Sequence, residues 1–508
     1  MGADIAGWIT SWAGWAPRRT ALRFEGRPVS YAELEQRIGS VAAWLRAGAV
    51  SSGDRVAYLG PNCLELLELL FACARLGAIL VPLNNRMPPA ELRVFVEATR
   101  PRLLVAEQGF RQVALDSAEA LGIERVRIFQ LGGELAGFDG AGDGSDVSVI
   151  DAAAPVLILF TSGTTGRPKG ATFTHQNLAF AALNVLTAFA VTATDEILTA
   201  VPMFHAGGLL IHTIPALCAG ATITIHREFD PGRLLEEIQR QRITLLACVP
   251  AMTSALASHP GWGAADLSSL RLVVTGSTVV PRRAIEPWQR KGVSVAQGYG
   301  MTETCVIATT MPPGGSPETA LTAGRPVIST QIRLVDQSGS DVKTGEPGEV
   351  WFRGGAVTPG YWENEQATRE AFRDGWLRSG DLGLVDEDGY LHIVGRLKDI
   401  IIVGGSNVHP RDLEAVLDGC ADIQEAAVVG RPDDELGEVP VACVVPFPGR
   451  RLTPEQVIGL FEDRLAAYKH PRDVIFLEAL PRNATDKVDR KLLYDIVSSA
   501  APPRCTSA

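Results

Sequence analysis

The sequence has 508 residues, of which 46% are hydrophobic and 21% are charged. This composition excludes a disordered chain, a coiled coil and a small disulfide-bonded domain, and the length predicts more than one domain. The net charge is −11 at pH 7 without a basic stripe, so we expect no nucleic-acid partner, because such partners require clustered Lys and Arg.

The eight cysteines are scattered, with no Cys-x-x-Cys pair and no Cys/His cluster at zinc-ligand spacing. We therefore expect free thiols in a reducing, cytoplasmic compartment. The N-terminus has no positively charged lead into an apolar run, so no secretory signal is expected. Residues 197–225 contain no Asp, Glu, Lys or Arg, but Pro and Gly divide them into strand, loop, core helix and strand, which predicts no membrane span.

Helical and strand patterns alternate along the first part of the chain. A capping box at Ser30–Glu33 begins a helix to about Arg46, and strands are predicted at 54–59 and 79–83 around a helix at 64–76. This alternation favours a largely parallel sheet with both faces covered. Residues 132–148 are rich in Gly and Asp and predict a surface loop before a strand at 155–160.

Beyond about Gly395 the pattern changes to a compact unit of domain size. Strands are predicted at 399–403, 425–429, 441–445 and 474–477, and helices begin at Pro410 and Pro454. The predicted fold class is α/β, with a large N-terminal domain of layered sheets and helices at residues 1–395. A small α+β C-terminal domain is predicted at residues 396–508.

Residues 161–170 follow the predicted strand and read Thr-Ser-Gly-Thr-Thr-Gly-Arg-Pro-Lys-Gly. Glycines let the backbone approach oxygen atoms, hydroxyl groups add donors and Lys169 adds a positive charge, so the stretch favours a phosphate-binding loop. It is not a Walker A loop, because Pro168 precedes Lys169 and no Ser or Thr follows. Taken alone, the stretch is also consistent with a polar turn.

Four further motifs follow in the chain. They are Gln297–Thr304, Gly375–Asp381, Gly395–Asp399 with Gly404 and Gly405 beyond it, and Pro481–Lys487. Together with residues 161–170, and in this order, they resemble the adenylate-forming superfamily of acyl-CoA synthetases, firefly luciferases and peptide-synthetase adenylation domains. The resemblance covers nearly the whole chain and is closest to single-chain fatty-acid and aryl-acid CoA ligases.

The resemblance implies an AMP-forming acid–thiol ligase with ATP, Mg²⁺ and coenzyme A as cofactors and cosubstrates. A carboxylate would attack the α-phosphate of ATP, pyrophosphate would leave, and a thiol would take the acyl group from the acyl-adenylate. Both steps develop charge on phosphate oxygens, which requires positioned cations and donors. The partners implied are a small carboxylic acid, ATP and an acyl acceptor, with the enzyme a monomer or homodimer.

Residue roles follow from the same resemblance. Lys487, in a mobile C-terminal domain, would bridge the acid and the α-phosphate, and Thr302, Glu303 and Arg396 would also take part in catalysis, with Glu303 as the Mg²⁺ ligand. Lys398 would be the hinge, and Gly404 and Gly405 would line the acceptor tunnel. The implied ATP and AMP site consists of Thr161, Ser162, Gly163, Thr164, Thr165, Lys169, Gly276, Ser277, Gly298, Tyr299, Gly300, Thr302, Asp381 and Arg396.

Each of these residues also has a plain structural interpretation. Asp381 and Arg396 could form an ion pair near a turn, Tyr299 could be a core aromatic, and Glu303 could be a solvated acid. The motifs depart from the family at Asp486, where Gly normally precedes the catalytic lysine, and at residues 276–280. The latter border the acyl pocket, so the substrate class does not transfer directly.

The acyl pocket is expected to be apolar. Peptide-synthetase domains place an Asp near the position of His205 to pair with an ammonium group, and a buried ammonium without a partner is costly. A hydrophobic monocarboxylic acid is therefore the predicted substrate. The candidate pocket residues are Phe204, His205, Val249, Met252, Val279, Met301, Cys305 and Val306.

The acceptor has alternatives. The C-terminal domain and Gly404-Gly405 favour coenzyme A, whereas some superfamily ligases pass the acyl group to an amine of an amino acid. A more distant alternative is an inactive homologue that acts as a binding protein. The absence of a Gly-x-Ser-x-Gly elbow disfavours a serine hydrolase.

Overall fold

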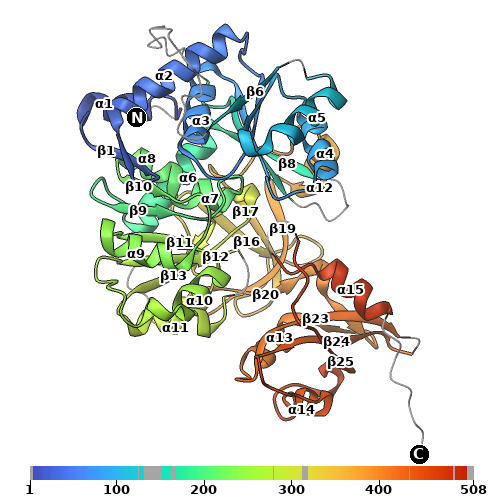
Figure 1. The fold of residues 1–508 in the computed structure, drawn as a ribbon. Helices are drawn as coiled ribbons and strands as arrows, with labels where there is room; N and C mark the ends of the chain where they lie inside the picture. The colour runs from blue at the N-terminus through green and yellow to red at the C-terminus, as the bar shows by residue number, and fades with distance from the viewer. Residues whose placement is uncertain are drawn as a thin grey trace, which may run out of the picture. The chain divides into compact units, whose positions relative to one another are not determined.

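The computed structural model describes residues 4–123, 125–130, 151–161, 168–277, 280–311, 319–433, 435–483 and 487–499. The chain divides into two compact units (Figure 1). The first unit comprises Met1–Ile332 and Phe352–Arg378, and the second comprises Arg333–Trp351 and Ser379–Ala508.

A six-stranded sheet in the first unit has the order β6-β5-β3-β4-β7-β8. Its strands are β3 (Arg55–Leu59), β4 (Ile79–Leu83), β5 (Leu103–Glu107), β6 (Val126–Phe129), β7 (Pro155–Thr161) and β8 (Lys169–Thr174). All neighbours are parallel except β7 and β8. The expected strands at 54–59, 79–83 and 155–160 are confirmed, as is the mainly parallel sheet, because unbroken apolar runs suit strands covered on both faces.

A nine-stranded sheet in the same unit has the order β15-β14-β13-β12-β11-β9-β10-β1-β2. Its strands are β1 (Thr20–Phe24), β2 (Arg27–Ser30), β9 (Glu196–Thr199), β10 (Thr222–Ile225), β11 (Leu245–Cys248), β12 (Leu272–Gly276), β13 (Ser294–Tyr299), β14 (Thr309–Thr310) and β15 (Arg325–Pro326). From β1 to β13 the strands along this order are parallel, whereas β2, β14 and β15 each join antiparallel.

The apolar stretch 197–225 divides as expected. β9 leads through a loop into the short α7 (Ala206–Gly208), a π-helical turn at Leu209–Thr213, α8 (Ile214–Ala219) and then β10. The π-helical turn has no counterpart in the sequence pattern. No helix among the described residues combines the length and the apolar character needed to cross a bilayer.

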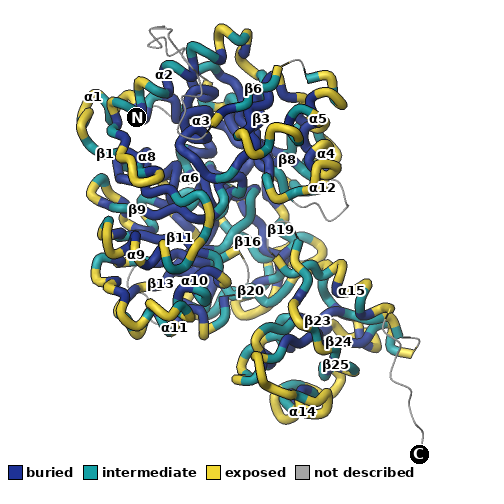
Figure 2. The backbone as a smooth tube through the Cα atoms, in the orientation of Figure 1, coloured by how far each residue is buried: buried dark blue, intermediate teal, exposed yellow. Residues whose placement is uncertain are grey.

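Helices form three layers around the two sheets (Figure 1). α2 (Tyr31–Ala47) and α8 contact strands of the nine-stranded sheet, whereas α3 (Leu64–Leu76) and α6 (His175–Phe189) contact strands of the six-stranded sheet. Ser30 caps α2 by accepting from the Glu33 amide at 3.1 Å. α4 (Pro89–Thr99) and α5 (Arg111–Leu121) bury apolar residues against the six-stranded sheet. α9 (Pro231–Gln241), α10 (Pro250–Ser258) and α11 (Arg282–Arg290) do the same for the nine-stranded sheet. Figure 2 marks β11 as buried and parts of these helices as exposed. The remaining helices of the first unit are α1 (Trp8–Trp15) and α12 (Glu365–Ala371).

A third sheet consists of β16 (Thr330–Val335), β17 (Gly348–Gly354), β18 (Phe372–Arg373), β19 (Trp376–Val385) and β20 (Leu391–Arg396). The division between the two units falls within this sheet. β19 and β20 are antiparallel.

The last sheet lies in the second unit and has the order β22-β21-β24-β23, with β25 beside β24. Its strands are β21 (Ile401–Val403), β22 (Ser406–Val408), β23 (Ile423–Asp433), β24 (Gly437–Pro446) and β25 (Asp473–Phe476), and its helices are α13 (Pro410–Asp418), α14 (Pro454–Gly459) and α15 (Arg490–Ser499). The four expected strands and both helix starts are present. Their boundaries differ, because Leu397–Asp399 form a 3₁₀ turn, so that β21 begins at Ile401, and because β23 and β24 extend beyond the expected strands at both ends.

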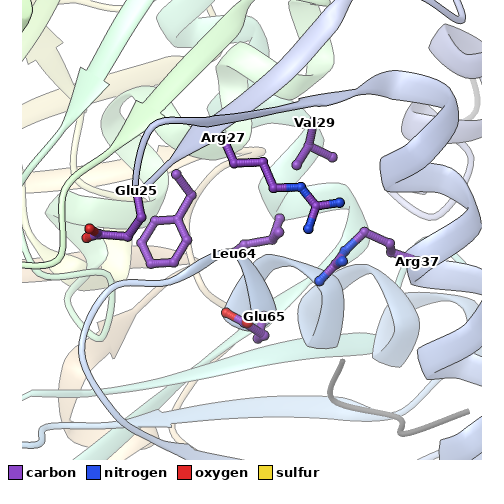
Figure 3. A pocket seen from close by; sticks show the side chains of 7 residues that line it. Glu25, Arg27, Val29, Arg37, Leu64 and Glu65 are labelled. Carbon is purple, nitrogen blue, oxygen red and sulfur yellow. The ribbon is translucent and has the colours of Figure 1, made fainter. Parts of the chain in front are cut away.

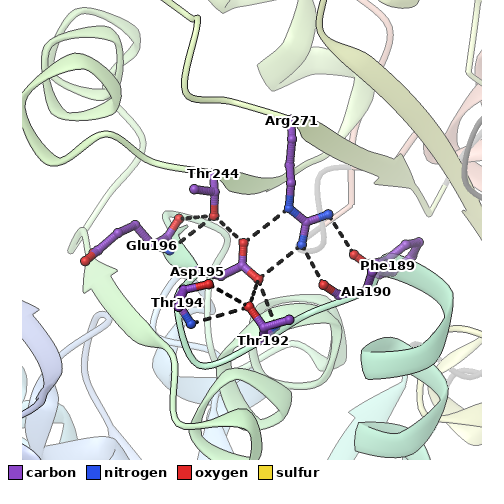
Figure 4. Close-up of polar contacts among 8 residues, drawn as sticks. All are labelled: Phe189, Ala190, Thr192, Thr194, Asp195, Glu196, Thr244 and Arg271. Atoms are coloured by element: carbon purple, nitrogen blue, oxygen red, sulfur yellow. Dashed lines mark hydrogen bonds and ion pairs between the residues drawn. The ribbon is translucent and has the colours of Figure 1, made fainter.

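An arginine belongs to a hydrogen-bond network that links the starting ends of three parallel strands (Figure 4). Arg271, just before β12, donates to both oxygens of Asp195 at 3.2 and 3.1 Å and to the carbonyls of Phe189 and Ala190 at the end of α6. Thr244, before β11, donates to Asp195 at 2.7 Å. These bonds hold the pKa of the Asp195 carboxyl below its usual range despite burial, which alone would raise it.

We expect Arg271→Met to lower the free energy of unfolding by about 2–4 kcal/mol, because Asp195 and two helix-end carbonyls lose their donors. Arg369→Met serves as control, since the pair of Arg369 with Glu365 is exposed and its loss should change stability by about 0.5 kcal/mol or less. Urea unfolding at pH 7 measures both. Equal effects of the two substitutions would contradict the anchoring role of Arg271.

Two histidines are buried as neutral rings. Burial, together with the neighbouring Arg271, lowers the pKa of His212, in the π-helical turn, to about 3. Burial lowers the pKa of His175 to about 4, and its Nδ1 accepts a hydrogen bond from the Ile5 amide at 3.3 Å, which a protonated ring could not do. As the pH falls below about 6.5, these two histidines therefore bind protons in the unfolded chain while they remain neutral in the folded chain.

The free energy of unfolding should fall as the pH falls from about 6.5 to about 4, by up to about 1.4 kcal/mol per pH unit for each histidine. Because its ring cannot be protonated, His212→Phe should remove one of the two contributions and flatten the dependence. Urea unfolding at pH 7, 6 and 5 compares the slopes. An unchanged slope in the variant would show that His212 is not buried neutral.

Candidate active site

The motif predicted to bind phosphate, residues 161–170, begins at the end of β7, and its last residues belong to β8. Thr161 and Lys169 face each other across this antiparallel pair, and the Thr161 hydroxyl donates to the Lys169 carbonyl at 3.4 Å. The pair thus fixes both ends of the motif and places the half-buried Lys169 at its exit. Ser162, Gly163, Thr164 and Thr165 lie outside the described residues.

Two predicted nucleotide-site glycines lie opposite each other at the carboxyl ends of β12 and β13. Gly276 pairs with Gly298, and a Cβ atom on Gly276 would meet the Gly298 carbonyl oxygen at 2.3 Å. Only glycine permits this approach. Ser277 follows with a φ of 67°, a left-handed conformation that non-glycine residues seldom adopt, so the chain turns sharply at this edge.

The motif after β13 forms a tight loop. The Ala308 amide donates to the Tyr299 carbonyl at 2.9 Å, and the Val306 amide donates to the Met301 carbonyl at 3.0 Å. A Cβ atom on Gly300 would meet the Val306 carbonyl oxygen at 2.1 Å. The loop contains a 3₁₀ turn at Thr302–Thr304, which presents Thr302 half-buried and Glu303 buried.

Tyr361 connects two of the predicted site residues. Its hydroxyl donates to Oε1 of Glu303 at 2.7 Å, and the Nζ atom of Lys169 lies 5.4 Å from the centroid of its ring. Burial raises the pKa of Tyr361 and the Glu303 carboxylate raises it further, so the phenol stays protonated as a donor. The structure thus brings Lys169 and Glu303 to one aromatic side chain.

Tyr361 was not among the residues predicted from the sequence. It lies 58 residues beyond Glu303 in a segment with no charged group, Thr358-Pro359-Gly360-Tyr361-Trp362. The available signal was a Pro-Gly turn followed by two aromatic residues, which marks a turn but not its partner.

The residues around Glu303 fit a magnesium ion that is shared with a nucleotide. The carboxylate is 5% exposed, and Tyr361 binds one of its two oxygens. Among the described residues, no group of three or more His, Cys, Asp or Glu side chains could hold a metal ion. Mg²⁺ usually takes one or two protein carboxylates together with phosphate oxygens and water, so one carboxylate beside a phosphate loop suits it.

The predicted acyl-pocket residues occupy several environments. The rings of Phe204 and His205 lie 4.4 Å apart between centroids, with 56° between their planes. Met252 belongs to the buried cluster under α10, and Val249 packs against that cluster. Their place in an acyl pocket remains a prediction.

Other candidate pocket residues lie on the loop after β13. Met301 and Val306 are half-buried, and Val306 has a φ of 76°. Cys305 is 2% exposed, and burial raises the pKa of its thiol, which therefore stays protonated and does not act as a nucleophile. Val279 lies outside the described residues.

Asp381 and Arg396 pair across β19 and β20 in the second unit. They are register partners, and Nε of Arg396 lies 2.7 Å from Oδ1 of Asp381. The Asp381 side chain is 7% exposed and that of Arg396 is 52% exposed. The ion pair therefore compensates a buried carboxylate, while the guanidinium remains accessible to a ligand.

The other C-terminal candidates lie on turns. Lys398 is exposed in the 3₁₀ turn after β20. Gly404 and Gly405, with φ values of 54° and 83°, form the two-residue turn between β21 and β22, where both residues need a left-handed conformation. Lys487 is exposed, and its amide donates to the Asn483 side chain at 3.1 Å. Asp486 lies outside the described residues.

A cavity of about 240 Å³ lies at the start of α3, apart from these motifs (Figure 3). Its two arginines are engaged by acids, Arg27 with Glu33 at 2.6 Å and Arg37 with Glu68. The residues that line the cavity are Phe24, Glu25, Arg27, Val29, Arg37, Leu64 and Glu65.

Comparison with known proteins places the chain among enzymes. The model of the AMP-binding enzyme family matches residues 9–362, and that of the AMP-binding enzyme C-terminal domain matches residues 412–487. The indoleacetate–CoA ligase of Aromatoleum aromaticum is 41% identical over 97% of this chain and 98% of its own length. The feruloyl-CoA synthase of an Amycolatopsis species is 39% identical over 95% and 97%.

Two solved structures of one CoA synthetase are also similar to this chain. The o-succinylbenzoate CoA synthetase MenE of Bacillus subtilis, in complex with the acyl-adenylate intermediate OSB-AMP, has a TM-score of 0.86 and 30% identity over 98% of both chains. The same enzyme with ATP and magnesium ion has a TM-score of 0.86 and 31% identity, covering 96% of this chain and 99% of that one.

These findings confirm the predicted adenylate-forming superfamily and the α/β fold with a small C-terminal part. They also confirm an AMP-forming acid–thiol ligase, which forms acyl-AMP from a carboxylic acid and ATP, uses Mg²⁺ and transfers the acyl group to coenzyme A. They therefore favour coenzyme A over an amine acceptor and an active enzyme over a binding protein. The chain belongs to the AMP-binding enzyme family.

Proposed function

We propose that this ligase activates a hydrophobic, aromatic monocarboxylic acid and transfers it to coenzyme A. The observation that carries the adenylation step is the grouping of Lys169 and Glu303 around Tyr361 at the exit of the phosphate-binding motif. An ammonium group and a carboxylate able to bind a metal ion, at that place, suit a nucleoside triphosphate with its cation. The aromatic class is supported by the named substrates of two relatives, indoleacetate and feruloyl.

The proposed roles of the site residues follow the course of the reaction. Lys169 and the preceding loop hold the β- and γ-phosphates, and Thr302 donates to the α-phosphate. Asp381 accepts from the ribose hydroxyls beside Arg396, and Tyr299 stacks on adenine near Gly276 and Ser277. Glu303 holds Mg²⁺, which would neutralise charge on the phosphate oxygens.

The first chemical step forms a bond between a carboxylate oxygen and the α-phosphorus while the bond from that phosphorus to the pyrophosphate oxygen breaks. In this proposal Lys487 would bridge the two anions and lower their repulsion. In the second step the thiolate sulfur of coenzyme A attacks the acyl carbon, and AMP leaves with the bonding electrons. We place Lys487, Lys398, Gly404 and Gly405 in a C-terminal domain that begins near residue 396.

The acid would lie against an apolar surface. The Phe204 and His205 rings offer an aromatic edge, and no Lys or Arg stands among the candidate pocket residues to match a second carboxylate. We also propose a cytoplasmic location, supported by free thiols at all seven cysteines in the described part of the chain.

We expect Lys487→Ala to slow carboxylate-dependent exchange of labelled pyrophosphate into ATP by about two to three orders of magnitude, because the charge between the two reacting anions is removed. Nucleotide binding should be nearly unchanged. Lys491→Ala is the matched control, since Lys491 is also an exposed lysine of the C-terminal segment. Equal exchange rates in the two variants would remove Lys487 from the reaction.

An acid panel tests the substrate class. Arylacetic and cinnamic acids should exceed acetate in kcat/KM by about 10- to 100-fold, since a buried ring contributes about 1.5–3 kcal/mol. Succinate should fail, because its second carboxylate would be buried without a partner. Mass spectrometry with coenzyme A or glycine as acceptor should detect the thioester alone. Efficient use of succinate, or amide formation, would contradict the proposal.

A further inference from the structure

We propose that Tyr361 is a positioning residue that sets the affinity of the site for Mg²⁺ by orienting the Glu303 carboxylate, and that its ring separately holds Lys169. The proposal rests on the proposed function, in which Glu303 carries the metal ion. It adds a residue that lies outside every motif used to infer that function.

The hydrogen bond from Tyr361 fixes the rotation of the carboxylate. Glu303 is 5% exposed, and its Oε1 accepts from the phenol at 2.7 Å. A charge-assisted bond of this length restrains the carboxylate plane and leaves the second oxygen to bind a cation. Hydrogen bonds to metal-binding carboxylates typically change metal affinity by about 10- to 100-fold when they are lost.

The ring of Tyr361 acts on a different group. Nζ of Lys169 lies 5.4 Å from the ring centroid, which is within the range of a cation–π interaction. The ring therefore restrains the ammonium group at the exit of the phosphate-binding motif. The two functions can be separated, because phenylalanine retains the ring and lacks the hydroxyl.

Backbone pairing determines where Tyr361 lies. The Thr358 amide donates to the Glu303 carbonyl at 2.8 Å, the Thr172 amide to the Gly360 carbonyl at 3.0 Å, and the Trp362 amide to the Gly170 carbonyl at 2.7 Å. Residues 358–362 are thus bonded to β8 on one side and to the Glu303 turn on the other. Because the backbone holds this segment, removal of one hydroxyl should not displace it.

Tyr361→Phe tests the carboxylate. With a fluorescent ATP analogue and neither acid nor coenzyme A, the Mg²⁺ concentration that gives half-maximal analogue binding should rise about 10- to 100-fold. Affinity at saturating Mg²⁺ should change less than about threefold, because the ring and Lys169 are retained. Tyr31→Phe is the matched control, since Tyr31 is a buried tyrosine whose hydroxyl donates to the Ala221 carbonyl at 2.9 Å, away from the site.

Two further variants separate the contributions. Tyr361→Leu should also weaken analogue binding at saturating Mg²⁺, by about two- to fivefold, because the cation–π interaction is lost. In a Glu303→Gln background, Tyr361→Phe should leave the Mg²⁺ dependence unchanged, since the carboxylate that it orients is absent. A merely structural role would lower stability and leave the Mg²⁺ dependence as in the wild type.

The proposal is overturned if Tyr361→Phe and Tyr31→Phe show the same Mg²⁺ dependence while the wild type exchanges pyrophosphate normally. In that case the proposed function stands and only the role of Tyr361 fails. It is also overturned if the double variant still shows the shift. A wild-type protein whose nucleotide binding ignores Mg²⁺ and which exchanges no pyrophosphate would contradict both proposals.

Discussion

Burial of a carboxylate costs folding free energy unless hydrogen bonds or a cation compensate its charge. In the candidate site of the first unit, this requirement applies to Glu303. The tyrosine hydroxyl compensates one oxygen, and the backbone of the same turn accepts from Thr358. A cation and its phosphate ligands would complete the compensation. The requirement explains why a segment from far along the chain is fastened both to the turn after β13 and to the strand after the phosphate-binding motif.

The two large sheets supply the rigidity for this arrangement. Parallel strands present their carboxyl ends at one edge, which is where binding residues collect in such sheets. β12 and β13 end at that edge with paired glycines, while Arg271 and Asp195 fasten the opposite, starting ends. Because bonds at the starting ends of the strands hold their register, turns and left-handed residues can occupy the carboxyl ends.

Much of the fold could be predicted from local patterns. Apolar runs predicted β3, β4 and β7, and Ser30, Pro410 and Pro454 correctly marked helix starts. The π-helical turn at Leu209–Thr213 and the 3₁₀ turn at Leu397–Asp399 could not be predicted, because tertiary packing selects them from sequences that also allow α-helix or strand.

The candidate site also contains residues that local sequence patterns indicated and one that they did not. Its motif residues were recognisable because glycines, hydroxyls and charges stand close together in the chain. Tyr361 was not, because its partners Glu303 and Lys169 are distant in sequence and meet it through backbone pairing with β8 and with the Glu303 turn. A single aromatic residue in a turn has no local pattern that reveals a remote carboxylate.

The glycine pair at the ends of β12 and β13 also limits which mutations this edge of the sheet can accept during evolution. A methyl group on Gly276 would collide with main-chain oxygen, which no side-chain rotation can relieve. A larger residue there would force the two strands apart. Variation at this edge is therefore confined to neighbouring positions whose side chains can change while the backbone keeps its course.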